Sequence, residues 1–393
     1  MVPEFRRIYN ARYSEDTYRA FLASLNREGG NTLDFRVAET PVFLPEEFKQ
    51  RLLEAGNQVL AQLQQPGFFD KLAGAVPQHY RVPGETARPE FLQVDFAVCA
   101  DQEGTLVPQL IELQGFPSVY CYQALLARKF REFFFVPAGW TSYFGALDEA
   151  GYLQLLQEVI VGPHDPRQVI LLEFQPEKQK TRIDFYCTQK MLGVKPVCVT
   201  QVMQRGTQLF YREGGKKIPI RRIYYRSIFD EMERAGLPIP GFFFAELDVE
   251  WVPHPNWYFK LSKFTLPLLQ SPYVPEAYFL HQLERYPEDL ENFVLKPLYS
   301  FAGSGVLVDI DAGILDRITD RENYILQRKV AYHPVVETLD EKARVEIRLM
   351  YVWRDRPELV HNLARLSKGK MMGVDYNKNK TWVGASVAFH SGH

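Results

Sequence analysis

The stretch FVLKPLYSFAGSGVLV, residues 293–308, contains the features that decide the fold. It predicts a strand that ends at Lys296, a short loop with Gly303, Ser304 and Gly305, and then a second strand. Glycines let backbone N–H groups approach phosphate oxygens without a side-chain clash, and a lysine neutralises phosphate charge. The stretch is not a Walker A loop, because GxxxxGK[ST] is absent and the lysine precedes the glycines. A phosphate-binding loop and a simple Gly-Ser-Gly turn both remain open.

Acidic side chains occur on a pair of predicted strands nearer the N-terminus. Residues 91–118 have the pattern of two strands joined by a turn at residues 102–104. Asp95 lies on the first strand, and Glu112 and Gln114 lie two positions apart on the second, so the last two share one face. Two carboxylates and an amide oxygen are ligands suited to Mg²⁺ held against substrate phosphates. The alternative is a solvated sheet face that carries acidic and amide residues.

A further lysine, Lys263, lies inside the apolar run LSKFTLPLL of residues 261–269. A lysine in such a run must extend its ammonium group to solvent, pair with an acid or bind an anion. The sequence alone leaves these readings open.

The rest of the chain alternates between helical and extended patterns. Helices are predicted over residues 14–30, 44–67, 120–135, 178–192 and 276–285. Strands are predicted over residues 169–174, 195–200, 324–330 and 343–353, and a hairpin with its turn at Gly214-Gly215. The strand–helix–strand order over residues 169–200 favours a parallel α/β unit.

The motifs, taken in order, resemble the ATP-grasp synthetase domain of the glutathionylspermidine synthase family in its circularly permuted form. In that family the metal-binding strands precede the nucleotide lysines and the glycine loop, as they do here. The family's Asp and Glu-x-Asn metal set is similar to Asp95 and Glu112, with Gln114 in the asparagine place. Its N-K-x-x-L-P-L-L stretch matches Lys263 in SKFTLPLL, and its K-K-P strand matches Lys296 in LKP.

The resemblance covers roughly residues 90–393 and implies an α+β or α/β chain with a circularly permuted ATP-grasp fold. The domain organisation that follows is a helical region (1–90), a metal-ligand sheet (91–165), a pre-ATP-grasp-like α/β unit with a hairpin (166–255) and a nucleotide-binding part (256–393). The implied activity is an ATP-dependent carboxylate–amine ligase that forms an amide through an acyl phosphate. Its substrates would be a small-molecule or peptide acid and an amine, and its cofactors ATP and Mg²⁺.

The resemblance also assigns roles to individual residues. The Mg²⁺ ligands would be Asp95, Glu112 and Gln114. The ATP-binding residues would be Lys263, Lys296, Ala302, Gly303, Ser304, Gly305, Gln327, Arg328 and Val330. The groups that stabilise the acyl phosphate would be Arg365 and Arg348. Among them, the segment from Gln327 to Val330 would be the adenine hinge, and the glycine loop would close over the γ-phosphate and exclude water.

The chain departs from the family pattern at three positions. Gln93 replaces an arginine two residues before the metal aspartate, Arg328 replaces the hinge glutamate, and Leu366 replaces the acid after Arg365. His390 falls near the family's closing histidine. These departures keep a second class open, a nucleotide-binding pseudoenzyme or scaffold that has lost ligase activity, and a small-molecule kinase is a third.

Composition limits the remaining classes. The 393 residues carry 46 Lys and Arg against 48 Asp and Glu, a net charge of −2, which argues against a nucleic-acid partner. No apolar run of ~18 residues exists, so no membrane span is expected. The four cysteines, Cys99, Cys121, Cys187 and Cys198, show no zinc spacing. They indicate buried reduced thiols in a cytoplasmic protein.

Overall fold

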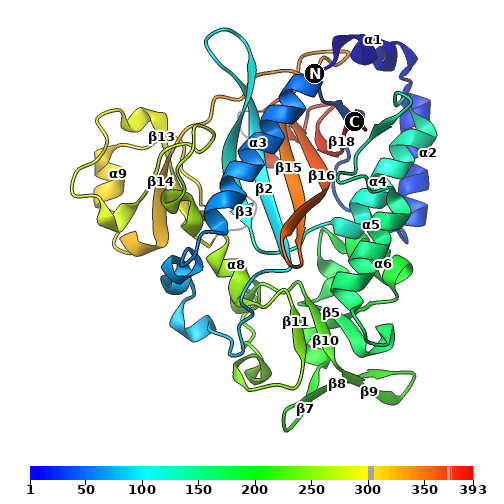
Figure 1. Ribbon diagram of the computed structural model, residues 1–393, viewed down its shortest axis with the longest axis vertical. Coiled ribbons are helices and arrows are strands. Elements are labelled where there is room, and N and C mark those ends of the chain that lie inside the picture. The colour runs from blue at the N-terminus through cyan, green and yellow to red at the C-terminus, as the bar shows by residue number, and fades with distance from the viewer. Residues whose placement is uncertain (300–304, 370–371, 373, 393) are drawn as a thin grey trace.

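The computed structural model describes residues 1–299, 305–369, 372 and 374–392, and has a mixed α+β architecture (Figure 1). The helices in this part of the chain are α1 (Pro3–Arg12), α2 (Glu15–Glu28), α3 (Glu46–Leu63), α4 (Tyr120–Phe133), α5 (Glu149–Leu156), α6 (Arg182–Leu192), α7 (Phe229–Arg234), α8 (Asn256–Lys260) and α9 (Ala312–Asp316). The predicted helices over residues 14–30, 44–67 and 120–135 are confirmed as α2, α3 and α4.

A five-stranded antiparallel sheet lies at the centre of the molecule, in the order β17-β16-β15-β2-β3. Its strands are β2 (Phe91–Ala100), β3 (Leu106–Gln114), β15 (Arg344–Trp353), β16 (Pro357–Ser367) and β17 (Gly384–Ser386). The sheet therefore brings residues 91–114 beside residues 344–386. Its register places Asp95 opposite both Glu112 and Arg348.

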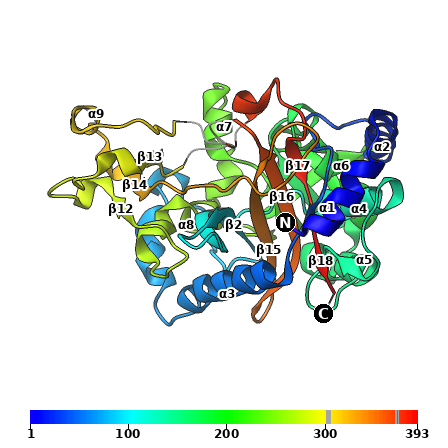
Figure 2. The same cartoon turned by 90° about the horizontal axis from the view of Figure 1, so that it is seen from above.

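Different helices cover the two faces of this sheet (Figure 2). On one face Val94 and Phe96 of β2 share an apolar cluster with Leu52 of α3. On the other face Phe91 packs edge-on against Tyr120 of α4, with ring centroids 4.8 Å apart. Because strand side chains alternate between faces, the odd-numbered residues of β2, including Asp95, point to the α4 side.

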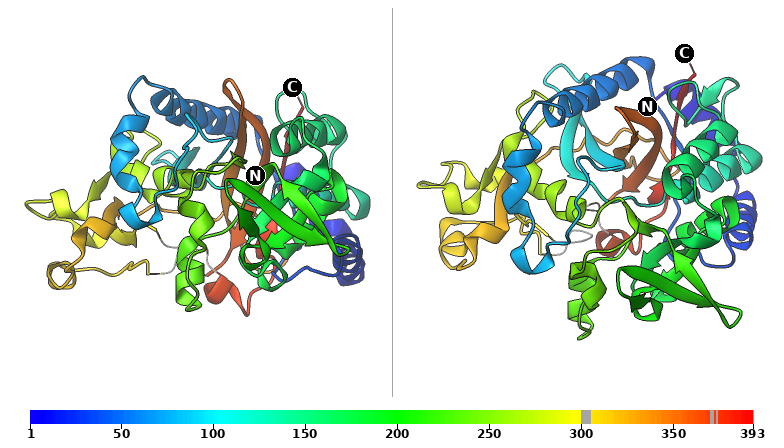
Figure 3. Two further views of the ribbon diagram at one scale, coloured as in Figure 1. Left: turned by 90° about the horizontal axis from the view of Figure 1, so that it is seen from below. Right: turned by 60° about the horizontal axis from the view of Figure 1, so that its bottom comes forward.

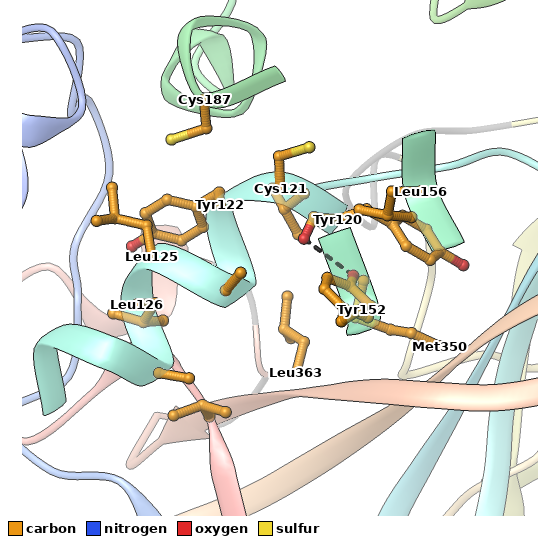
Figure 4. Packing of buried hydrophobic residues seen from close by; sticks show 14 of the residues in the cluster. Tyr120, Cys121, Tyr122, Leu125, Leu126, Tyr152, Leu156, Cys187, Met350 and Leu363 are labelled. Atoms are coloured by element: carbon orange, nitrogen blue, oxygen red, sulfur yellow. Dashed lines mark hydrogen bonds between the residues drawn. The ribbon is translucent and has the colours of Figure 1, made fainter. Parts of the chain in front are cut away.

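The first turn of α4 is fixed in a core formed with α5, α6 and the sheet. Figure 4 shows Tyr120 and Tyr122 of α4 with Met350 and Leu363 of the sheet in this cluster. The Tyr152 hydroxyl donates a hydrogen bond to the Tyr120 carbonyl oxygen at 3.0 Å. This packing holds the start of α4 in a fixed place over the central sheet.

A four-stranded parallel sheet forms the lower part of the molecule, in the order β11-β10-β5-β6 (Figure 1). Its strands are β5 (Val169–Glu173), β6 (Lys195–Cys198), β10 (Arg222–Tyr225) and β11 (Glu250–Val252). Helix α6 joins β5 to β6, so the predicted strand–helix–strand unit is confirmed.

A three-stranded arm extends from this parallel sheet (Figure 3). It contains β7 (Met203–Arg205), β8 (Gln208–Glu213) and β9 (Lys216–Ile220). The β8–β9 pair is the hairpin predicted around Gly214-Gly215, and both glycines have positive φ. The residues RIYY that follow leave the hairpin and form β10.

A second three-stranded sheet, β12-β14-β13, lies at the opposite side of the molecule from α4–α6 (Figure 1). Its strands are β12 (Ala277–Phe279), β13 (Phe293–Pro297) and β14 (Tyr324–Arg328). The predicted helix over residues 276–285 is wrong, because this segment pairs with β14 as a strand and continues as a 3-10 turn. The predicted second strand after the glycine loop is also wrong in extent, since its only described pairing is a single bridge between Leu295 and Leu307.

The chain ends meet in a third small sheet, β1-β18-β4. It is formed by β1 (Val42–Phe43), β4 (Trp140–Thr141) and β18 (Ala388–Ser391). His390, near the family's closing histidine, lies on β18, and its ring is stacked on Phe144 with centroids 4.3 Å apart.

All four cysteines are free thiols. Three are buried as expected, and Cys198 is half-buried. None of the helices in the described segments is both long and apolar enough to cross a membrane.

Helix α2 is capped by Ser14, whose Oγ accepts a hydrogen bond from the Thr17 backbone N–H at 3.1 Å. Replacing Ser14 by alanine is expected to lower the free energy of unfolding by about 1 kcal/mol, because that N–H loses its partner. Urea denaturation of the two proteins measures the difference. An Asp16→Ala variant, which changes an exposed first-turn acid and keeps the cap, should differ less from the wild type.

Candidate functional site

A cavity of 540 Å³ lies on the α4 side of the central sheet. It is lined by side chains from β3, β15, β16 and β17, the start of α4, and the segments 258–263 and 298–299. Its charged lining residues in the described chain are the cations Arg36, Lys263, Arg348, Arg365 and Lys378 and the carboxylate Glu112. The excess of cations makes the cavity suited to an anionic ligand.

The floor of the cavity contains a buried ion pair between neighbouring strands. Arg348 of β15 donates two hydrogen bonds to Asp95 of β2, from Nε to Oδ1 and from Nη2 to Oδ2, each 2.5 Å long. The Asp95 side chain is 1% exposed and the Arg348 side chain 7%. Burial acts to lower the pKa of Arg348, but Asp95 and the nearby acids outweigh it and raise that pKa. The guanidinium is therefore fixed in direction and permanently charged.

Gln93, one of the three departures from the family pattern, is in contact with the ion pair of Arg348 and Asp95. Its Oε1 accepts a hydrogen bond from Arg348 Nη1 at 3.2 Å, and its Nε2 donates to the Ser118 carbonyl oxygen at 2.8 Å. The side chain is fully buried. Gln93 thus holds the guanidinium of Arg348, which reaches it from the adjacent strand. The sequence pattern singled out Arg348 without indicating this contact.

Arg365 of β16 is supported from behind by a carboxylate. Glu346 of β15 lies directly opposite Arg365 in the register, and their side chains approach to 3.3 Å. The Tyr332 hydroxyl donates a hydrogen bond to the same carboxylate at 2.9 Å. Burial raises the pKa of Glu346, and the Arg365 charge opposes that rise. Arg365 also lies 3.7 Å from Asp95, so both arginines belong to one network. Sequence reasoning missed Glu346 and Tyr332.

A β-bulge shapes the acidic side of the cavity. The register of β2 and β3 shifts after Asp95, so that Ile111 has no partner residue while Glu112 still faces Asp95. Glu112 and Gln114 both line the cavity, as their spacing predicts. Gln114 Nε2 donates to Glu112 Oε1 at 2.7 Å.

The pKa of Glu112 is lowered by cations that come from the last third of the chain. Burial acts to raise this pKa, but Lys263, Arg348, Lys296 and Arg365 together lower it. Arg348 Nη2 lies 3.9 Å from Glu112 Oε1. The carboxylate from the first third and the basic side chains from the last third therefore meet at one site.

The two predicted nucleotide lysines lie next to this carboxylate. Lys263 is 7% exposed and lines the cavity; burial lowers its pKa, and Glu112 and Asp230 oppose the effect. Lys296 lies behind the cavity wall, where its Nζ donates to Gln327 Oε1 at 2.5 Å and to the bulged Ile111 carbonyl oxygen at 3.3 Å. Burial lowers the pKa of Lys296 to about 8, although Glu112 acts to raise it.

The predicted adenine hinge lies further from the cavity. Gln327 is 1% exposed, and its Nε2 donates to the Leu110 carbonyl oxygen of β3 at 3.3 Å. Arg328 points the other way, to the surface, where it pairs with Glu276 at 2.9 Å and Asp289 at 2.8 Å. Val330 follows β14 and is half-buried. Arg328 is thus committed to a surface network.

The glycine loop is only partly within the described chain. Ala302, Gly303 and Ser304 lie outside the described residues. Gly305 has φ +74°, and a Cβ there would lie 3.0 Å from the Pro297 ring. The positive φ at this position therefore favours glycine, and a Cβ would also press against the proline ring.

The three predicted metal ligands differ in the side chains that they contact. Both oxygens of Asp95 accept hydrogen bonds from Arg348, so a metal ion would have to share this carboxylate with the guanidinium. Glu112 Oε2 and Gln114 Oε1 are not used by the bond between these side chains and are oxygen donors of the kind that Mg²⁺ takes. Within the residues that the structure describes, no group of three or more His, Cys, Asp or Glu side chains is arranged to hold a metal ion.

A comparison with solved structures finds a protein with a similar fold. No known family profile matches the sequence, and no curated protein sequence matches it. Among solved structures, a glutathione synthetase-like effector from Globodera pallida, determined in its apo form, matches with a TM-score of 0.57. The match covers 97% of this chain and 98% of that one, at 10% identity. The chain has a glutathione synthetase-like fold.

The glutathione synthetase-like fold agrees with the predicted relationship at the level of architecture. At 10% identity the match carries information about the fold and not about the reaction. The case for chemistry therefore depends on the cavity and the charged network of the central sheet.

Proposed function

We propose that the chain is an ATP-dependent carboxylate–amine ligase with a circularly permuted ATP-grasp fold, related to the glutathionylspermidine synthases. The observation that carries the proposal is the convergence of Glu112 with Lys263, Arg348 and Arg365 on one cavity, with Lys296 behind its wall. Such an arrangement suits a triphosphate held beside an acid. The glutathione synthetase-like fold over nearly the whole chain supports it.

In the proposed reaction a carboxylate oxygen of the acid attacks the γ-phosphorus of ATP, and ADP leaves with the pair of electrons of the broken P–O bond. The amine nitrogen then attacks the acyl carbon, inorganic phosphate leaves, and the nitrogen loses a proton. The task of the protein is to position the groups and to neutralise charge.

The chain's own residues divide this task. Lys263 and Lys296 would hold phosphate oxygens near β3, and Arg365 and Arg348 would face the charge that develops on the acyl phosphate. Asp95 and Glu346 keep the two guanidinium groups in place. Glu112 and Gln114 would hold Mg²⁺, which would supply positive charge to neutralise the phosphates.

One observation favours a second function, a nucleotide-binding protein without ligase activity. Arg348 occupies both oxygens of Asp95, a residue that the family resemblance assigns to the metal. If Asp95 serves only to hold Arg348, the site retains cations for phosphate binding but lacks part of the catalytic set.

The two functions are separated by two measurements on the full chain. A thermal-shift assay with MgATP is expected to raise the melting temperature, since a ligand that binds the folded state stabilises it. ADP release on adding a pool of carboxylic acids and amines is expected only for the ligase. A melting shift without ADP release supports the second function, and a product that retains phosphate indicates a kinase. No shift with MgATP contradicts both proposals.

The proposal also gives a pH dependence. Lys296 has a pKa lowered to about 8 by burial, against the opposing effects of Glu112 and Glu346. Below that pH the lysine is charged and ready to bind phosphate, and above it binding must first add a proton. The dissociation constant of MgATP is therefore expected to rise with pH, by up to about tenfold per unit above this pKa. Calorimetric titrations between pH 6.5 and 9.5 check the trend, and an unchanged affinity over that range would contradict the role of Lys296.

A further inference from the structure

The cavity extends across the full width of the central sheet. It is lined by Glu112 and Gln114 of β3 at one edge of the sheet and by Gly384 and Ala385 of β17 at the other. Four interstrand spacings separate these edges, which at ~4.8 Å each amounts to about 19 Å. The cavity is therefore long enough to hold a second ligand beside the terminal phosphates of a nucleotide.

The two ends of the cavity differ in chemistry. At the β3 end lie Glu112, Gln114 and Lys263, together with the apolar and aromatic side chains of Phe116, Tyr258 and Leu261. The β17 end, here called the distal end, is formed by Phe35, Val119, Tyr122, Leu363 and Val383. The cations beside it, Arg36 and Lys378, are exposed and belong to its rim. The β3 end therefore combines charged and aromatic side chains, whereas the wall of the distal end is apolar and predicts that this end takes an apolar group.

The aromatic wall of the distal end is held in place from both sides. The Phe35 ring packs edge-on against Tyr122, with centroids 5.4 Å apart and an interplanar angle of 85°. Arg36 Nε donates to the Val383 carbonyl oxygen at 3.0 Å, which ties the Phe35 segment to the residues before β17. Tyr122 is fixed on α4, where its backbone N–H donates to Asp184 Oδ1 at 3.0 Å (Figure 4 shows the surrounding core). The wall is thus preformed.

The spacing along β16 connects the distal end to the charged network. Leu363 and Arg365 are two residues apart on this strand and both line the cavity, so they share a face about 6.6 Å apart. An acid whose carboxylate lies against Arg365 therefore places a group a few bonds away against Leu363, which lines the distal end together with Phe35.

We infer that the acid taken by the proposed ligase carries an aromatic or branched aliphatic side group, which occupies the distal end. This inference rests on the proposed function for the identity of the acid as a substrate. It does not rest on it for binding, because the distal end and Arg365 are present without nucleotide.

The test measures binding of simple acids to the full chain by calorimetry in the absence of nucleotide. The probes are acetate, 3-phenylpropionate and 3-phenylpropylamine. The first two share a negative charge and differ in the ring, whereas the last two share the ring and differ in charge. 3-Phenylpropionate is expected to bind at least about tenfold more tightly than acetate, because only it buries a ring. It is also expected to bind more tightly than the amine, because Arg365 repels a cation. Equal affinity for acetate and 3-phenylpropionate would overturn the inference.

Variants locate the binding. Phe35→Ala is expected to weaken 3-phenylpropionate binding at least fivefold and to leave acetate unchanged, and Phe35→Leu, which retains an apolar side chain, is expected to lie between. Phe244→Ala is the matched control, since Phe244 is an exposed aromatic residue outside the cavity lining. If both Phe35 variants bind 3-phenylpropionate with wild-type affinity, the side group of the acid does not bind at the distal end and the inference is wrong.

Two further measurements keep the inference separate from the proposed function. Adenosine added as a competitor is expected not to displace 3-phenylpropionate, and displacement would assign the apolar end to the nucleobase instead. MgATP binding is measured on its own. MgATP binding without acid selectivity refutes the inference and leaves the ligase proposal standing, whereas acid selectivity without MgATP binding refutes the ligase and leaves the binding site.

Discussion

Replacing Arg348 by methionine is expected to lower the free energy of unfolding by about 3–5 kcal/mol, the largest effect expected of any single change in the network. Arg348 donates both of the short hydrogen bonds that Asp95 receives and one to Gln93. Methionine keeps an apolar stem of similar length but leaves the Asp95 carboxylate, 1% exposed, without this partner. An ionised carboxylate buried without its partner is what makes the loss large. Chemical denaturation of the purified proteins measures it.

Two further variants interpret the result. The double variant Asp95→Asn with Arg348→Met removes the buried negative charge as well and is expected to recover part of the loss, because the two sites are coupled. Arg354→Met is the matched surface control. It removes exposed ion pairs to Glu158 and Glu358 at 3.3 and 3.2 Å and is expected to cost less than about 1 kcal/mol. If Arg348→Met costs no more than this control, the pair does not stabilise the sheet.

The network also indicates what the sequence could predict. The helical period of the apolar residues was sufficient to predict α2 and α3. The two-residue period of a strand was sufficient to place Glu112 and Gln114 on one face. The Arg348–Asp95 pair joins residues 253 positions apart through the alignment of β15 and β2. No local pattern carries that alignment, because it depends on which strands become neighbours in the sheet.

The bulge at Ile111 is another feature that a pattern of alternation does not reveal. Leu110 and Leu113 both lie in the apolar cluster under α3, although they are three residues apart on one strand. Regular alternation would place them on opposite faces. The extra residue at Ile111 reverses the pattern and lets its own carbonyl oxygen accept from Lys296.

The prediction of a helix over residues 276–285 was wrong for a different reason. Its residues favour a helix when taken alone, but Tyr278 and Phe279 pair with Leu326 and Ile325 of β14. Phe279 also packs against Phe264, with ring centroids 4.9 Å apart. Tertiary pairing therefore overrides the local preference, which is a weak term for each residue.

Replacing Lys296 by methionine is expected to weaken MgATP binding by about 10- to 100-fold, because a charged hydrogen bond to phosphate contributes about 1.5–3 kcal/mol. The same change is expected to alter the stability of the ligand-free protein little. Burial already disfavours the lysine charge, so its removal offsets the hydrogen bond lost from Gln327. Titration calorimetry measures the affinity, and thermal unfolding without ligand measures the stability.

The separation of these two effects is what identifies a phosphate-binding lysine. A lysine with a purely structural role, which bridges β3 and β14 through Ile111 and Gln327, would lower the ligand-free melting temperature and leave the affinity for MgATP intact. Lys342→Met is the control, since Lys342 is a surface lysine, 57% exposed, paired with Glu337. If Lys296→Met binds MgATP as tightly as this control does, the lysine does not hold a phosphate. The proposed placement of the nucleotide beside Glu112 would then be wrong.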